Sequence, residues 1–314
     1  IRRFAEWGAN YNMASLGSVL KMFMSVPDAL KPPKPVTAYS VNNDLPEIKM
    51  TKAREQVLGV LKDNPPLPAT LLAKEAGVGT SVIKGLAKLD ALIAVELPPP
   101  AAFKIPNWQV SGPKLSLEQA SAAASLRAHV EAGEFYVSVL EGVPGSGKTE
   151  VYLEAVCAAL AQGKQALVLL PEIALGAQWL ARFKARFGCE PTEWHSDLTQ
   201  TTRRKTWRAV ATGEAKVIVG ARSALFLPYT DLGVIIVDEE HDQSFKQEDG
   251  VIYNARDMAV VRAQLGDIPI SLVSATPSLE SLRNVECGRY EHFDLLDRYA
   301  GAELPEILII DMRQ

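Results

Sequence analysis

The eight residues 142–149, Gly-Val-Pro-Gly-Ser-Gly-Lys-Thr, match the phosphate-binding loop pattern G-x-x-x-x-G-K-[ST] at every fixed position. Glycines let backbone N–H groups wrap around phosphates, a lysine reaches the terminal phosphates, and a hydroxyl ligates Mg²⁺. The apolar run 135–140 predicts a buried strand before the loop, and residues 150–162 predict a helix after it. A nucleoside triphosphate would then lie at a helix N-terminus, held by Gly142, Val143, Pro144, Gly145, Ser146, Gly147, Lys148 and Thr149, with Thr149 on the Mg²⁺.

The composition describes a chain that folds around sizeable cores. Its 314 residues are 47% hydrophobic and 22% charged, which is enough for two or more domains. Its three cysteines stand far apart without a C-x-x-C pair, which argues against a disulfide framework and against a zinc site in this chain, and fits a reducing cytoplasm. Because no apolar run approaches about 18 residues, membrane and secretory interpretations have little support.

The N-terminal third differs in charge from the rest. Residues 1–111 carry more basic than acidic side chains, and residues 112–314 carry fewer. This asymmetry is compatible with nucleic-acid binding by the N-terminal part, and equally with an ordinary solvated surface. The first residue is not methionine, so we expect residues 1–26 to be the tail of an upstream DNA-binding domain in a longer protein.

A small module is expected after a proline-rich segment. Residues 27–49 contain five prolines and are predicted to be a linker without a regular element. Residues 50–110 predict a winged-helix domain with three short helices, the third capped by Ser81, and a strand hairpin that includes 92–97. Lys84 and Lys88 would face outward one turn apart on the third helix and contact DNA phosphates. A spacer or a protein-docking module remains an alternative.

Short apolar runs alternate with helical segments from residue 112 onward. The runs are residues 165–170, 192–195, 216–219, 234–237 and 270–273. This alternation is typical of an α/β domain with a parallel sheet and helices on both faces. Ligands of such folds gather at the carboxyl ends of the strands. Residues 112–314 are therefore predicted to form the ATP-binding domain.

Four polar residues, Asp238-Glu239-Glu240-His241, directly follow the apolar run 234–237. An acidic segment at a strand end, downstream of a phosphate-binding loop, is typical of a Walker B site. One carboxylate is needed to hold Mg²⁺ and a second to orient and deprotonate the attacking water. We assign Asp238 to the metal and Glu239 to the water, with Lys148 as the third catalytic residue.

The order of the motifs resembles that of superfamily 2 helicases, with Ser274-Ala275-Thr276 following the next strand. The residues 171–175, 220–226, 238–242 and 253–257 are similar to those of one family in particular, PriA, the primosomal protein N-prime. The resemblance covers nearly all of the chain. It implies a P-loop NTPase (RecA-like) helicase lobe preceded by a winged helix. A second lobe with an arginine finger and a cysteine-rich zinc insertion is expected outside this chain.

The resemblance assigns further residues by position. Gln119 is similar to the glutamine that reads adenine, although an ordinary residue in a helix's first turn is an alternative. Residues 171–178 and 220–223, including Arg222, resemble segments that track single-stranded DNA. Gly176 and Ala221 stand where the family often has threonine, which puts side-chain phosphate contacts there in doubt.

Residues 243–256 resemble the family's aromatic-rich loop, which couples DNA binding to hydrolysis. Stacking aromatics and cations suit that role, although an ordinary surface loop is an alternative. The residues concerned are Phe245, Lys246, Tyr253 and Arg256. His241 would link this loop to the nucleotide, and Ser274 and Thr276 would relay the nucleotide state.

The resemblance implies an ATP-dependent 3′-to-5′ DNA helicase of replication restart. It further implies ATP and Mg²⁺ as cofactors, and as partners forked and single-stranded DNA, single-stranded-DNA-binding protein and primosome proteins, in the bacterial cytoplasm at the nucleoid. Two alternatives stay open: a non-hydrolysing platform that binds forks and partner proteins, and a generic superfamily 2 translocase.

Overall fold

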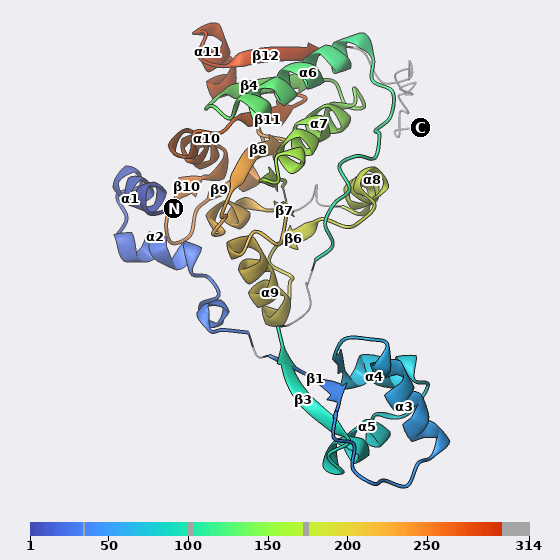
Figure 1. Cartoon of the computed structure of the whole chain (residues 1–314). Helices are drawn as coiled ribbons and strands as arrows, with labels where there is room; N and C mark the ends of the chain where they lie inside the picture. The colour runs from blue at the N-terminus through green and yellow to red at the C-terminus, as the bar shows by residue number, and fades with distance from the viewer. Residues whose placement is uncertain (34, 99–102, 172–175, 297–314) are drawn as a thin grey trace, which may run out of the picture. The chain divides into compact units, whose positions relative to one another are not determined.

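The computed structural model describes residues 1–33, 35–98, 103–171 and 176–296. The chain divides into two compact units (Figure 1). The larger unit contains residues 1–30 and the described residues after 102, and the smaller unit contains those between 31 and 98. No helix in these described ranges is long and apolar enough to cross a membrane.

A seven-stranded sheet forms the centre of the larger unit. Its strand order is β12-β4-β11-β8-β5-β7-β6, and every neighbouring pair is parallel. The strands are β4 (Val137–Gly142), β5 (Gln165–Leu169), β6 (Thr192–Trp194), β7 (Val217–Gly220), β8 (Leu232–Asp238), β11 (Ile270–Ser274) and β12 (Glu291–Leu295). The predicted parallel α/β sheet is confirmed, and β12 at its edge is a strand that the apolar pattern missed.

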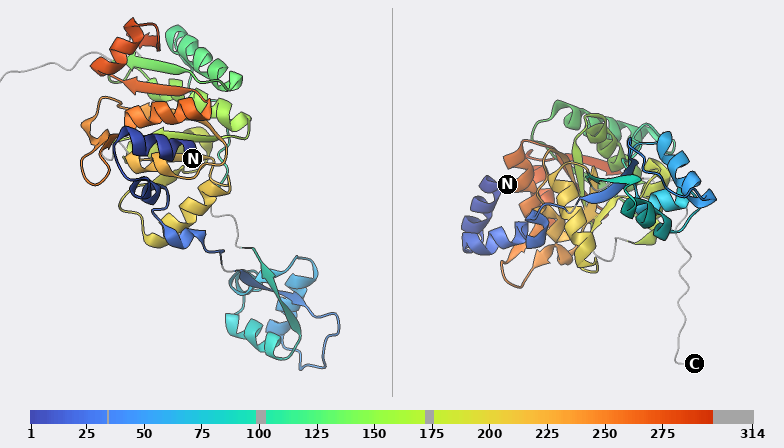
Figure 2. Two further views of the ribbon diagram at one scale, coloured as in Figure 1. Left: turned by 90° about the vertical axis from the view of Figure 1, so that its left-hand side faces the viewer. Right: turned by 60° about the horizontal axis from the view of Figure 1, so that its bottom comes forward.

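Helices cover both faces of this sheet (Figures 1 and 2). Side chains alternate along each strand, so that Leu167 and Leu169 of β5 enter one core and Ala166 and Val168 enter the other. One core contains helices α6 (Leu117–Ala132), α7 (Lys148–Ala161) and α8 (Ala177–Phe187). The opposite core contains α1 (Arg2–Tyr11), α2 (Leu16–Phe23), α9 (Gln200–Ala211) and α10 (Ala255–Gly266). Burial on both faces explains why the strands read as continuous apolar runs.

The N-terminal helices are part of the larger unit. Phe4 of α1 lies 5.8 Å from the ring of Phe226 and 5.9 Å from that of Phe23. Trp207 of α9 donates its indole N–H to the carbonyl of Phe23 at 2.9 Å. Residues 1–26 were expected to belong to an upstream domain. Because their apolar side chains enter the core of the sheet domain, the structure corrects that boundary.

The smaller unit combines three helices with a three-stranded antiparallel sheet. The helices are α3 (Lys52–Lys62), α4 (Ala69–Glu75) and α5 (Thr80–Lys88), and the strands are β1 (Val36–Val41), β2 (Leu67–Pro68) and β3 (Leu92–Leu97), in the order β2-β1-β3. The three short helices that the sequence predicted for residues 50–110 are present. Gly79 caps α5 rather than Ser81, and Ser81 lies inside the first turn.

The predicted linker 27–49 contains regular structure, which contradicts the sequence analysis. Residues 27–30 form a 3-10 helix, and the six residues of β1 pair with β3 along its whole length. The prolines flank β1 without entering it, so every residue of the strand keeps its N–H. The partner of β3 is therefore a strand that precedes the helices, not the hairpin strand that was expected.

Candidate nucleotide-binding site

The phosphate-binding loop connects β4 to α7 at the carboxyl edge of the large sheet. Gly145 and Gly147 adopt φ of +86° and +82°, which disfavour any residue with a side chain. A Cβ on Gly147 would lie 2.5 Å from Nε2 of Gln119. Lys148 begins α7, so the N-terminus of this helix points toward the loop. The predicted strand-loop-helix arrangement is present.

Lys148 is largely buried among main-chain carbonyls. Its Nζ donates to the carbonyl of Gly142 at 2.6 Å and to that of Val143 at 3.3 Å. Burial lowers the pKa of this amine, and the nearby carboxylates of Glu239 and Asp238 act in the opposite direction. The ammonium therefore lies close to both acidic residues of the Walker B segment.

Asp238 ends β8 as a buried carboxylate with two donors. Its Oδ1 accepts from the N–H of Glu239 at 3.0 Å, and its Oδ2 accepts from the hydroxyl of Tyr152 at 2.9 Å. Burial raises the pKa of Asp238 to about 6, although the Tyr152 hydrogen bond favours the charged form. A carboxylate in low-dielectric surroundings, with free lone pairs, is a hard oxygen ligand that suits Mg²⁺.

Glu239 turns the chain sharply after β8. Its φ is +52°, a left-handed conformation that is uncommon for a residue with a long side chain. The side chain is half exposed, and its Oε2 lies 3.6 Å from Nδ1 of His241. Glu239 can thus reach solvent next to the phosphate loop, as a residue that activates water must.

A pocket of about 540 Å³ joins these groups. Its lining combines the loop, the start of α6 and α7, two side chains of α8 and the Walker B acids. They are Pro113, Leu115, Gln119, Pro144, Gly145, Gly147, Lys148, Thr149, Glu150, Gln178, Arg182, Asp238 and Glu239. A hydroxyl for Mg²⁺, a cation for phosphate and two carboxylates therefore share one cavity.

The donor set fits a bound nucleotide with Mg²⁺. The hydroxyl of Ser146 is buried in the loop and has no hydrogen-bond partner. An orphaned polar atom inside a phosphate-binding loop is readily explained by a ligand oxygen. Lys148, Thr149 and Asp238 supply the ammonium, hydroxyl and carboxylate that phosphate and Mg²⁺ require.

Gln119 lies at the wall of the pocket in the first turn of α6. Its Oε1 accepts from the N–H of Ser116 at 2.9 Å in a capping box, and its Nε2 donates to the carbonyl of Ser146 at 2.8 Å. The amide thus connects the helix start to the phosphate loop. One amide N–H and one lone pair of the side chain remain beyond these two bonds, and contact with a base stays a prediction.

Glu240 anchors the Walker B segment to the end of the sheet. Its carboxylate accepts from the N–H of Ser278 at 2.6 Å and pairs with Arg256 at 3.2 Å. Ser281 adds a hydroxyl donor at 3.2 Å. Arg256 was expected to bind DNA. Because it is buried in this ion pair, the structure assigns it to holding the segment in place.

His241 meets the motif that follows β11. Its Nδ1 lies 2.7 Å from the hydroxyl of Ser274, which also accepts from the N–H of Thr276 at 2.9 Å. Ser274 is buried and Thr276 is exposed. The structure thus brings together His241, Ser274 and Thr276, which were expected to couple the nucleotide state to DNA binding.

The aromatic-rich loop does not present its rings. Phe245 and Tyr253 are 1% and 4% exposed in the core that also contains Phe226. The expectation that they stack on bases is not met by this structure, because both rings are buried in the apolar core. Lys246 is exposed, and the guanidinium of Arg222 donates to the carbonyl of Ser244 at 2.9 Å. Arg222 thereby joins the second expected DNA-tracking segment, 220–223, to the aromatic-rich loop.

Residues 172–175 of the first DNA-tracking segment lie outside the described residues. Gly176 caps α8, and a Cβ there would meet nothing within 4 Å, so the backbone does not require a glycine. Ala221 is buried. In the smaller unit, Lys84 and Lys88 are both exposed on α5, as predicted.

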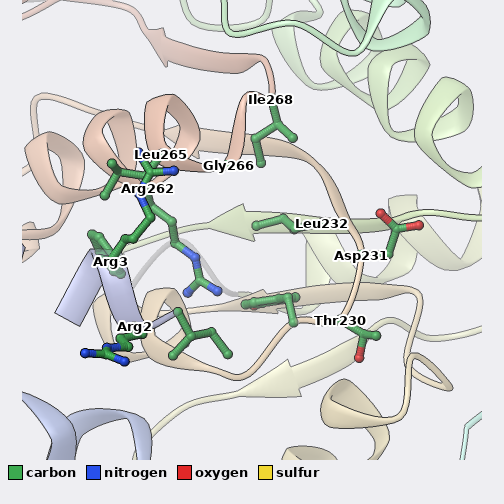
Figure 3. Close-up of a pocket in the computed structure, with 12 residues that line it drawn as sticks. Arg2, Arg3, Thr230, Asp231, Leu232, Arg262, Leu265, Gly266 and Ile268 are labelled. Carbon is green, nitrogen blue, oxygen red and sulfur yellow. The ribbon is translucent and has the colours of Figure 1, made fainter. Parts of the chain in front are cut away.

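A second pocket of about 490 Å³ lies at the opposite, amino end of the sheet strands. Figure 3 shows Arg262 of α10 extending into it between the start of α1 and residues 230–232. The Arg262 guanidinium donates to the carbonyl of Leu227 at 3.0 Å and lies over the rings of Phe4 and Tyr229. Burial lowers its pKa to about 10. These contacts make Arg262 a packing residue, and the nucleotide chemistry belongs to the first pocket.

Comparison with known sequences agrees with this geometry. A sequence model of the DEAD/DEAH box helicase family matches residues 119–285, which span Gln119, the phosphate loop, the Walker B acids and the Ser274 motif. The chain belongs to the DEAD/DEAH box helicase family. Membership implies binding of ATP and Mg²⁺, and the residue types that such binding requires line the pocket.

The chain is also similar in sequence to proteins named "Replication restart protein PriA". The Rickettsia conorii protein is 50% identical over 175 residues, which cover 56% of this chain and 27% of that protein. The Haemophilus influenzae protein is 37% identical over 325 residues, covering 98% and 43%. The Chlamydia pneumoniae protein is 38% identical over 323 residues, with the same shares. The chain thus spans less than half the length of these relatives.

Two residues of this helicase site escaped the sequence analysis. Tyr152 and Trp179 form hydrogen bonds that end on Asp238, but each reads as an apolar core residue in its helix. A usable signal was the hydroxyl of Tyr152, which lies one helical turn after Lys148 and is buried with the apolar residues of the helix. Among the described residues, no group of three or more His, Cys, Asp or Glu is arranged to hold a metal ion.

Proposed function

We propose that the larger unit is the ATP-binding lobe of an ATP-dependent 3′-to-5′ DNA helicase that acts on forked and single-stranded DNA in replication restart and primosome assembly. One observation carries the proposal: Lys148, Asp238 and Glu239 line one pocket with the phosphate-binding loop. The name of the relatives, which refers to replication restart, supports the biological role.

The residues of the pocket divide the chemistry of phosphoryl transfer between them. Lys148 and the loop N–H groups bind the phosphates, while Asp238 and Thr149 would hold Mg²⁺. The metal, when bound, supplies positive charge that neutralises the phosphates. Glu239 orients a water molecule and takes its proton at the carboxylate. Gln119 offers its remaining amide N–H and lone pair to the base.

Coupling to DNA would pass through the segment after β8. Glu239 lies 3.6 Å from His241, and His241 lies 2.7 Å from Ser274. Arg222 ties the 3-10 turn after β7 to the loop at Ser244 and Lys246. A change at the nucleotide would therefore reach the exposed Thr276 through a few polar contacts.

The test is ATP hydrolysis with and without forked DNA, measured on this chain and on a longer protein that contains it. We expect DNA to stimulate hydrolysis in the longer protein and to have little effect on this chain alone, because the arginine finger expected in a second lobe is worth roughly 10³–10⁵ in rate. DNA binding by the longer protein without any hydrolysis would favour the non-hydrolysing platform instead.

Replacement of Glu239 by glutamine separates binding from chemistry. The amide cannot take a proton, so we predict a rate of hydrolysis roughly 10²–10⁴-fold lower in the longer protein. Nucleotide affinity should stay within a factor of about three. A variant that loses affinity as strongly as activity would contradict the assignment of Glu239 to the water.

A further inference from the structure

A chain of two hydrogen bonds crosses the apolar layer between α8 and the Walker B strand. The indole N–H of Trp179 in α8 lies 2.7 Å from the hydroxyl of Tyr152 in α7, which lies 2.9 Å from Oδ2 of Asp238. Tyr152 is 0% exposed, Trp179 9% and Asp238 7%. The three residues come from three different elements and meet behind the nucleotide pocket.

The direction of both hydrogen bonds follows from the chemistry of the groups. An indole nitrogen can only donate, so the Tyr152 oxygen must accept from Trp179. The single phenolic proton is then directed to Asp238, which as a carboxylate can only accept. The other oxygen of Asp238 accepts from the N–H of Glu239. Each carboxylate oxygen therefore has one fixed donor and retains a further lone pair, and Asp238 lines the pocket.

Packing alone does not explain these polar atoms. The surrounding core consists of aliphatic and aromatic side chains of α7 and α8, including Val156 and Phe183. Phenylalanine at 152 would fill nearly the same space as tyrosine without burying a hydroxyl, and a wholly apolar side chain at 179 would bury no indole N–H; a buried polar group is costly unless it is paired. The hydrogen bonds of both residues lead toward Asp238.

We propose that Tyr152 and Trp179 are positioning residues for Asp238, so that helix α8 sets the orientation of the carboxylate that would hold Mg²⁺. This inference rests on the proposed role of Asp238 in the nucleotide site. Tyr152 acts on the carboxylate directly, and Trp179 acts through Tyr152 by fixing where its proton points. Neither residue touches the nucleotide itself, because neither lines the pocket.

The test is the Mg²⁺ dependence of binding of a fluorescent ATP analogue to this chain. Tyr152→Phe should weaken the apparent Mg²⁺ affinity by about 10-fold, the scale observed when a residue that orients a metal ligand is removed. Trp179→Phe should weaken it by roughly 2- to 10-fold, the loss of one net hydrogen bond. Affinity for the analogue without Mg²⁺ should be unchanged in both variants.

A double variant tests whether Trp179 acts through Tyr152. In the Tyr152→Phe background, Trp179→Phe should cause no further loss of Mg²⁺ affinity, since no phenolic proton remains to direct. Fully additive effects of the two substitutions would overturn the positioning role of Trp179.

Phe183→Leu is the matched control for core damage. Phe183 stacks on Trp179 with ring centroids 5.6 Å apart and contributes no polar atom. This variant should lose thermal stability and keep the Mg²⁺ dependence of the parent. An unchanged Mg²⁺ dependence in Tyr152→Phe would overturn the inference alone, whereas a parent chain that does not bind the analogue at all would overturn the proposed function as well.

Discussion

At the scale of one residue, burial of the Asp238 carboxylate lowers the stability of the folded chain. The carboxylate has two good donors, yet burial dominates and its pKa rises from 3.8 to about 6. A group that is more easily protonated in the folded state favours folding below its unfolded pKa. That contribution is lost as the pH rises through the folded pKa. The contribution of Asp238 to the free energy of unfolding is therefore least favourable at neutral and higher pH.

Asp238→Asn should reveal this cost. Asparagine is uncharged at every pH, so the variant's free energy of unfolding, relative to that of the parent, should improve between pH 4 and pH 8. The improvement corresponds to the pKa shift of Asp238 by about two units, or up to about 3 kcal/mol. Denaturant titrations at several pH values measure the difference. A difference that does not change with pH would contradict the burial of a charged carboxylate.

Sequence motifs identify the residues expected to contact a nucleotide. They do not identify the residues that hold those side chains in position. Lys148, Thr149 and Asp238 were predicted because phosphate and Mg²⁺ demand particular groups at particular spacings. Tyr152 and Glu240 act through geometry that only the folded chain contains. Phe245 and Tyr253 show the converse error, since an aromatic residue in a polar loop reads as a stacking surface until its burial is known.

At the scale of elements, the strand-helix alternation predicted the sheet because strands buried on both faces are continuous apolar runs. Strand β12 escaped because it is the edge strand next to β4 and three of its five residues are polar or charged. Strand β1 escaped because prolines surround it. Both errors arise where pairing with a neighbouring strand decides the structure and local composition does not.

Helix α1 should stabilise the sheet domain directly. Phe4 packs against Phe23, Phe226 and the guanidinium of Arg262. Replacing this buried ring with alanine leaves a cavity, so Phe4→Ala should lower the free energy of unfolding of the larger unit by about 3–5 kcal/mol. Met13→Ala is the control, because Met13 is 95% exposed and its loss should change stability by less than about 0.5 kcal/mol. Equal effects of the two would contradict the placement of α1 on the core.

At the scale of the whole molecule, the chain consists of two compact units that present different side chains. The larger unit contains the nucleotide pocket. The smaller unit presents Lys84 and Lys88 on the exposed face of α5. This chain spans 27% to 43% of the length of the relatives named above, and DNA unwinding is accordingly proposed for a longer protein.

Reversing the charge of Lys84 and Lys88 tests whether the smaller unit binds DNA through phosphates. Lys84→Glu with Lys88→Glu should weaken binding to duplex or forked DNA and reduce the salt slope by about two counterions. Sequence preference should not change. The matched control reverses Lys52 and Lys62, two exposed lysines of α3. A binding curve that is insensitive to the first pair would favour the protein-docking or spacer role.

The central claim is that the pocket at the carboxyl edge of the large sheet binds ATP with Mg²⁺. Equilibrium titration of this chain with a fluorescent ATP analogue and Mg²⁺ tests it most directly, with Lys148→Ala as the variant and Lys84→Ala as a control of equal charge. We predict that Lys148→Ala lowers the affinity by roughly 10- to 100-fold, the value of hydrogen bonds to a charged group, while circular dichroism shows an intact fold. Equal affinity of Lys148→Ala and the parent chain would contradict the account.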